Sequence, residues 1–187
     1  MRERSRRIVR SLAALMLALL PVSGAGAAEP RLIGVFRDWN AFRLDEATGP
    51  VCWMVSRPKK MEGDFTKRGD VFLLITHRPA ERSYDVVNFI AGYPFADHAE
   101  VTVQVGKQSF KLFSKDEQAW ARDENTDRAI AQSLRLSSTL VVRGTSLRGS
   151  RTTDTFSLAG STGAYQAIGD ACAERAPAPE PAPPPAP

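Results

Sequence analysis

The sequence contains few residues that could form a catalytic or metal-binding site. Its two histidines are His77 and His98, and its two cysteines are Cys52 and Cys172. A hydrolase could use either histidine beside a serine and a carboxylate, but the motifs GxSxG and HExxH do not occur. We therefore predict a protein that is not an enzyme and has no catalytic residue, metal site or cofactor. A hydrolase that uses His77 or His98 is the alternative.

The first 28 residues have the pattern of an export signal. Five arginines within the first ten residues precede a nine-residue apolar run at 12–20, and small residues follow at 25–27. This order predicts a signal peptide, residues 1–28, cleaved after Ala27 or Ala28. The segment 5–10 partly matches a twin-arginine signal, but the leucine-rich run favours the general secretory route. We expect the mature protein in the periplasm or cell envelope.

The positive net charge belongs to that leader. Five of the 25 basic residues but only one of the 21 acidic residues lie in the first ten positions, so the remainder is neutral. A nucleic-acid partner is therefore not expected, because such binding needs a basic face. No further apolar run is long enough for a transmembrane segment in the mature protein.

The two cysteines lie far apart and belong to no CxxC motif. This spacing suits neither a zinc site nor a redox-active pair. Because export would place both thiols in an oxidising compartment, we predict one intramolecular disulfide between Cys52 and Cys172. Two free thiols, or thiols paired with another chain, are the alternative.

Short apolar runs separated by turn residues predict a mainly β fold of the β-sandwich type. The central feature is a hairpin over 138–158, in which β-branched and apolar residues alternate on both sides of Gly149. A helix is expected at 123–136 with Asp123 as its N-cap, and a second short helix at 161–172. The other expected strands are 32–36, 39–44, 51–56, 70–76, 85–91, 100–105 and 109–113, of which 70–76 is expected to be buried on both faces.

The three tryptophans have two interpretations. Trp39, Trp53 and Trp120 could form an aromatic recognition surface. We favour a core position for Trp39 and Trp53, since both lie within apolar strands, and expect Trp120 to stabilise the connection to the first helix.

Two polar segments are candidates for contacts with a partner. The loop 58–70 carries Lys59, Lys60, Lys67 and Arg68, and we predict these residues as a partner-binding surface. An ordinary solvated connection is the alternative, because acidic residues are interspersed. The segment 176–187 has seven prolines in twelve positions, and we expect a disordered, extended tail that is a tether or simply a solubilising segment.

The order and spacing of several short motifs resemble the invasion associated locus B family of exported bacterial proteins. The resemblance extends from about Trp39 to Cys172. The motifs lie at 38–39, 51–54, 58–60, 67–69, 76–79, 92–95, 119–121, 144–149 and 153–158, and both cysteines match the family's positions.

This resemblance implies an immunoglobulin-like β-sandwich over 29–175, located in the periplasm or at the outer membrane. It also implies, for some members, a role in host-cell invasion and virulence; envelope integrity is a second possible role. It implies no catalytic residues. The expected partner is a protein or a cell-envelope component.

Overall fold

The computed structural model describes residues 28–173. The predicted proline-rich tail (176–187) lies outside the described residues, as does the predicted signal peptide (1–28) apart from Ala28. Between residues 28 and 173, no helix is both long and apolar enough to cross a membrane.

Antiparallel strands dominate the described residues, so the prediction of a mainly β fold is confirmed. Eleven strands form one sheet in the order β1-β2-β3-β5-β6-β9-β8-β7-β10-β11-β4. Their bounds are β1 (Arg31–Phe36), β2 (Trp39–Glu46), β3 (Gly49–Ser56), β4 (Lys60–Gly63), β5 (Phe72–Arg78), β6 (Ser83–Ile90), β7 (Glu100–Val105), β8 (Gln108–Lys115), β9 (Gln118–Ala121), β10 (Thr139–Thr145) and β11 (Arg151–Ser157).

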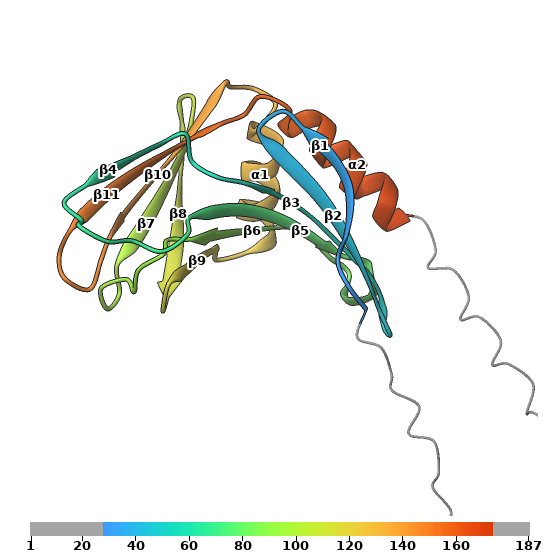
Figure 1. Cartoon of the computed structure of the whole chain (residues 1–187), viewed down its shortest axis with the longest axis horizontal. Helices are drawn as coiled ribbons and strands as arrows, with labels where there is room; N and C mark the ends of the chain where they lie inside the picture. Colours follow the sequence, from blue (N-terminus) through green and yellow to red (C-terminus); the bar gives the residue numbers. More distant parts are fainter. Residues whose placement is uncertain (1–27, 174–187) are drawn as a thin grey trace, which may run out of the picture.

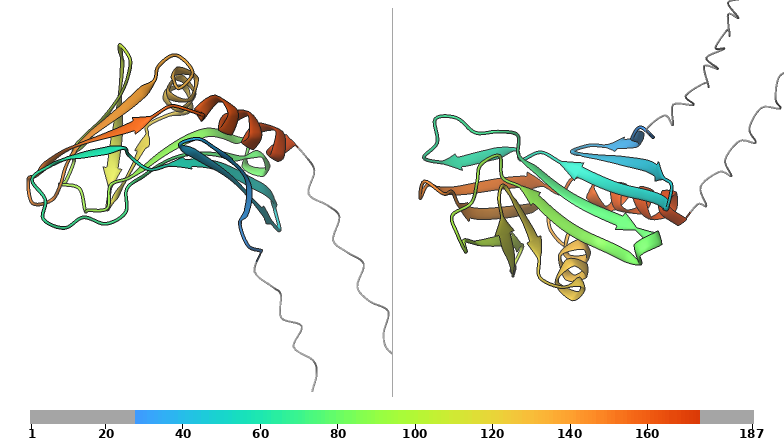
Figure 2. Two further views of the ribbon diagram at one scale, coloured as in Figure 1. Left: turned by 45° about the horizontal axis from the view of Figure 1, so that its top comes forward. Right: turned by 90° about the horizontal axis from the view of Figure 1, so that it is seen from below.

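The sheet bends sharply instead of lying flat (Figure 1, Figure 2). Only Arg57, Pro58 and Lys59 separate β3 from β4, yet β4 lies at the far edge of the sheet beside β11. The bend brings Phe89 on β6 against Phe156 on β11, with ring centroids 6.3 Å apart. The two layers expected of a sandwich are therefore two halves of one continuous sheet, with the core between them.

Alternation along β3 shows which side chains enter this core. Cys52 and Met54 are fully buried, whereas Trp53 is half-buried on the opposite face because successive strand residues point to opposite sides. The expectation that Trp53 lies in the core is therefore wrong. Trp39 is a core residue as predicted: its side chain is fully buried and its indole N–H donates to the Ser157 carbonyl at 3.0 Å.

Both predicted helices are present. The helix α1 (Glu124–Ser133) follows Asp123, whose carboxylate accepts the Thr126 N–H at 2.9 Å and caps the helix as predicted. The helix α2 (Ser161–Ala173) lies across β1, β2 and β3, and α1 lies against β6. Both contribute to the same core and lie on one side of the sheet (Figure 1).

The predicted hairpin over 138–158 is confirmed as the pair β10–β11. Two short strands were not predicted. Part of the expected loop 58–70 forms the edge strand β4, which pairs with β11, and Trp120 lies on β9 between β6 and β8. Strands of four residues are too short to give a clear alternation in the sequence.

Candidate functional site

Three connections at one end of the sheet surround a groove of about 900 Å³. The segment 63–69 leads from β4 to β5, the segment 92–94 follows β6, and the segment 146–150 joins β10 to β11. Each of them overlaps a motif that carries the family resemblance. The fold therefore places three motifs that are distant in the sequence around one cavity.

A buried ion pair holds the groove together. The Arg68 guanidinium donates two hydrogen bonds of 2.7 Å to the two carboxylate oxygens of Asp154, and its Nε donates to the Ala91 carbonyl. The side chains are only 3% and 1% exposed. Burial raises the pKa of Asp154, and the guanidinium opposes this shift. Such paired, two-point contacts fix geometry more strongly than a single hydrogen bond does.

Tyr93 connects this ion pair to the rest of the groove. Its hydroxyl shares a 2.6 Å hydrogen bond with Thr152, and the Arg68 guanidinium lies 4.7 Å from the centre of its ring. Burial raises the pKa of Tyr93. A Cβ on Gly144 would lie only 2.9 Å from the Tyr93 hydroxyl, so the small residue allows this close approach.

The rim of the groove is apolar and cationic. Leu147 is 62% exposed, and Phe65 lies against the Arg68 guanidinium with 5.4 Å between that group and the ring centre. Lys67 and Arg148 are exposed at the rim, with Asp64 as the acidic residue among the lining residues. These side chains suit a ligand with apolar and anionic groups.

The four predicted partner-binding residues have different environments. Lys59 pairs with Asp38, and Lys60 pairs with Glu62 on the surface. Lys67 is exposed and lines the groove, whereas Arg68 is buried. The Arg68 guanidinium therefore stabilises the interior of the protein and is not available to a partner. That the loop 58–70 contacts a partner stays a prediction, and it depends chiefly on Lys67.

Sequence reasoning did not predict Tyr93, Leu147, Arg148, Thr152 or Asp154 as site residues. For Asp154 a signal exists, because it shares one face of β11 with the apolar Phe156. A carboxylate on a core-facing position requires a buried partner. For the rim residues the sequence holds no comparable signal.

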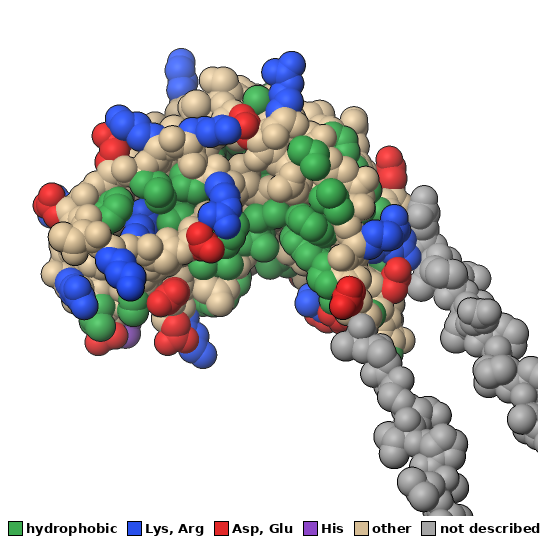
Figure 3. Space-filling view, viewed as in Figure 1, with side chains coloured by type: hydrophobic (Ala, Val, Ile, Leu, Met, Phe, Trp, Pro, Cys, Tyr) green, Lys and Arg blue, Asp and Glu red, His purple; other side chains and the backbone are tan. Residues whose placement is uncertain are grey.

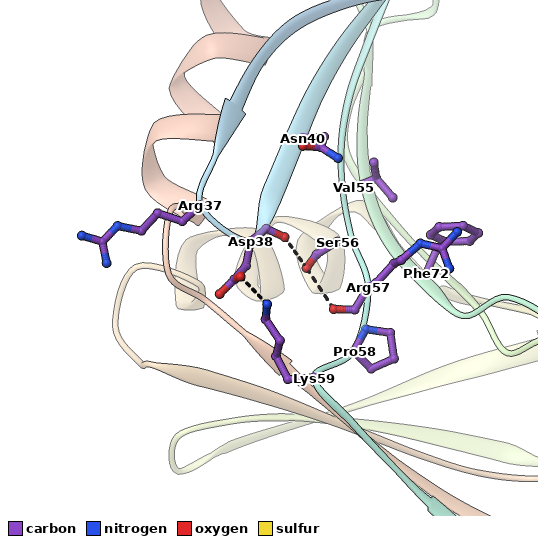
Figure 4. A pocket seen from close by; sticks show the side chains of 9 residues that line it. All are labelled: Arg37, Asp38, Asn40, Val55, Ser56, Arg57, Pro58, Lys59 and Phe72. Atoms are coloured by element: carbon purple, nitrogen blue, oxygen red, sulfur yellow. Dashed lines mark hydrogen bonds and ion pairs between the residues drawn. The ribbon is translucent and has the colours of Figure 1, made fainter.

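A smaller pocket of about 270 Å³ lies where β3 passes to β4 (Figure 4). Ser56 and Lys59 have the Ser-x-x-Lys spacing of some acyl-transfer enzymes. However, the Ser56 hydroxyl donates to the Asp38 carbonyl at 2.7 Å, and Lys59 points to the Asp38 carboxylate (Figure 4). The hydrogen bond from Lys59 is the main reason why the pKa of Asp38 is lowered. The Ser56 hydroxyl and the Lys59 ammonium group therefore both stabilise the contact with Asp38.

The two histidines differ in their surroundings. His77 is buried on β5, its Nδ1 accepts the Asp85 backbone N–H at 3.1 Å, and its ring contacts Tyr165 edge-on. Burial lowers the pKa of His77, and the Asp85 charge opposes this effect. His98 is exposed in a turn. Within residues 28–173, no hydrogen bond joins either histidine to a serine, and no group of three potential metal ligands occurs.

The predicted disulfide is confirmed. Cys52 and Cys172 are joined, with 5.8 Å between their Cα atoms, so the end of α2 is fastened to β3. Arg43 strengthens the same contact by donating to the Ala171 carbonyl.

Comparison with known proteins assigns the chain to a family. The model of the family described as Invasion associated locus B (IalB) protein matches residues 39–169. No curated protein and no solved structure matches the chain.

Proposed function

This chain belongs to the invasion associated locus B family, and from that premise we propose that it is an exported cell-envelope protein that binds a partner through the groove. It acts as a binding module and not as an enzyme. Host-cell invasion and envelope integrity are the processes to which such binding would contribute. The disulfide supports the proposal of export, since such bonds persist in oxidising compartments.

The observation that carries the binding proposal is the meeting of three family motifs around one groove. Loops held by a rigid scaffold are common sites of recognition. Here the scaffold includes the buried Arg68–Asp154 pair, which fixes the connection from β4 to β5 against β11. Because this connection is already held in place, less conformational entropy is lost when a ligand binds to it.

The rim indicates the chemistry of the partner. Leu147 and Phe65 offer apolar surface, and Lys67 and Arg148 offer positive charge. An extended polypeptide that alternates apolar and acidic side chains fits this combination, because its two kinds of side chain meet matching surfaces. We therefore favour a protein partner over a carbohydrate one.

A periplasmic hydrolase that uses His77 or His98 is the second candidate, and it has weaker support. The Nδ1 atom of His77 already accepts a backbone N–H, and His98 lies outside the residues that line the groove. A general base must reach the proton that it removes.

A capture experiment from the native cell envelope tests the proposal. The double variant Lys67→Ala/Arg148→Ala should weaken capture of the partner about tenfold, which corresponds to ~1.4 kcal/mol. The matched control Lys111→Ala/Lys115→Ala removes the same charge from β8, which does not line the groove. Equal capture by wild type and the groove variant would refute the groove as the binding site.

Export is tested separately by the mass of the protein in the periplasmic fraction. We expect a chain that begins at Ala28 or Glu29. A chain that retains Met1 in that fraction would contradict the predicted cleavage.

A further inference from the structure

One face of the sheet carries apolar side chains of which most are only half-buried, although Val51, which shares this face with Leu44, is 5% exposed. α1 and α2 both pack on the opposite face, with the core. β5 was expected to be buried on both faces, but its residues alternate between buried and half-buried, so this expectation is wrong. We call the second face of strands β2, β3, β5, β6, β8 and β9 the open face; its apolar residues are Phe42, Leu44, Trp53, Val55, Phe72, Leu74, Val86, Ile90, Phe113 and Trp120.

The strand register makes these side chains neighbours. Phe42 lies directly opposite Trp53, and their rings stack with centroids 5.5 Å apart. Phe113 lies directly opposite Trp120, with ring centroids 5.7 Å apart and the rings tilted by 30°. Hydrophobic side chains accordingly gather over the strands in the middle of Figure 3, on the side turned away from the helices. Contiguous apolar surface of this kind marks a site of interaction.

We propose that the open face binds the chain's own proline-rich C-terminal segment, with the last prolines resting on the Phe42–Trp53 stack. The segment 176–187 consists of proline, alanine and one glutamate. Proline-rich sequences favour the extended polyproline II conformation, which is recognised by aromatic surfaces at a small entropic cost.

The position of the C-terminal end of α2 supports the proposal that this segment binds the open face. Cys172 is bonded to Cys52, and Trp53 is the next residue of β3 but points to the open face. The Cys172 sulfur also lies 3.9 Å from the Pro50 carbonyl, close to the β2–β3 turn. The segment that follows Ala173 therefore starts beside the strand ends that border the stacked rings.

The segment after Ala173 is long enough to reach the stacked rings of Phe42 and Trp53. The fourteen residues 174–187 span about 43 Å at ~3.1 Å per residue. Passing round the strand ends requires about 10 Å, and returning along five residues of β3 to Trp53 requires about 16 Å. With roughly 26 Å used in total, about five residues remain to lie on the rings, which are Pro183–Pro187.

Because the C-terminal segment is covalently joined to the domain, even weak contacts with the open face can hold it there. A short tether gives an effective concentration in the millimolar range, so a contact with a millimolar dissociation constant is occupied for about half of the time. A few proline–aromatic contacts are therefore enough.

Hydroxyl-radical footprinting of the full-length protein, as processed by the cell, tests the proposal. Removal of residues 176–187 should increase the oxidation rate of Phe42 and Trp53 about two-fold, while Trp120, which the segment does not reach, stays unchanged. A length-matched variant with Pro183, Pro184, Pro185 and Pro187 changed to Ser should show the same increase. Unchanged oxidation of Phe42 and Trp53 in the truncated protein would overturn the proposal.

A second measurement identifies the occupant directly. Both cysteines are used in the disulfide, so Ala186→Cys supplies a single thiol for a spin label. The label should broaden the Trp53 indole signal more strongly than the Trp120 signal, at all protein concentrations. Broadening that grows with concentration would show that a second copy covers the face, and absence of broadening would show that the segment does not; either result overturns the proposal.

Discussion

Arg68 and Asp154 are 86 residues apart in the sequence, yet their side chains form two hydrogen bonds of 2.7 Å inside the protein. The pair joins the connection before β5 to the middle of β11. It therefore links the two halves of the bent sheet at the point where the groove opens.

Removal of one member of this pair should destabilise the protein strongly. Asp154→Asn leaves the buried Arg68 guanidinium without a counter-charge, and we expect a loss of about 3–5 kcal/mol in the free energy of unfolding, measured with urea. The control is Asp70→Asn, which breaks the exposed pair between Arg57 and Asp70 and should cost less than about 1 kcal/mol. Similar losses in both variants would contradict the structural importance of the buried pair.

Reduction of the disulfide should lower the melting temperature of the protein. The bond between Cys52 and Cys172 closes a loop with a sequence separation of 120, for which chain entropy gives an upper bound of about 5 kcal/mol. We expect the double variant Cys52→Ser/Cys172→Ser to melt at the temperature of the reduced wild type and to be insensitive to reductant. If reductant leaves the melting temperature of wild type unchanged, the prediction fails.

Asp127 should make stability depend on pH. Burial raises the pKa of this carboxyl from 3.8 to about 6, and neighbouring Asp85, Asp123 and Glu124 add to the effect. Between pH 4 and 6 the folded state therefore binds more protons than the unfolded state, so the free energy of unfolding should decrease as the pH rises through this range.

The variant Asp127→Asn isolates this effect. Its amide oxygen can still accept the Val87 N–H, as the carboxylate does at 2.8 Å, but it does not titrate. The stability of wild type relative to this variant should fall between pH 4 and 6 and stay constant above. Two parallel stability profiles across that range would disprove the assignment.

Two glycines with positive φ allow a test of close packing at the start of α2. At Gly160 (φ +91°) a Cβ would lie 1.9 Å from the Phe36 carbonyl oxygen, whereas at Gly149 (φ +82°) it would meet nothing within 4 Å. Gly149→Ala should cost only the backbone strain of about 1–2 kcal/mol. Gly160→Ala should cost clearly more, because the β1–β2 turn must move away; equal thermal shifts in the two variants would exclude this contact.

The sequence alone determined the elements that depend on neighbouring residues. Alternation of apolar and polar side chains was sufficient for the β10–β11 hairpin, and Asp123 marked the start of α1, because pleat and helix capping act over only a few residues. The expectation of export, together with the presence of one cysteine pair, was sufficient to predict the disulfide.

Only the tertiary structure decided which face of each strand is covered. A period of two places Cys52 and Trp53 on opposite faces, but the pattern is the same whichever face the helices cover. Likewise, Lys67 and Arg68 are adjacent cations in the sequence, and it is the bend of the sheet that exposes one and buries the other against Asp154. Burial of that kind depends on contacts between distant segments, which local spacing does not encode.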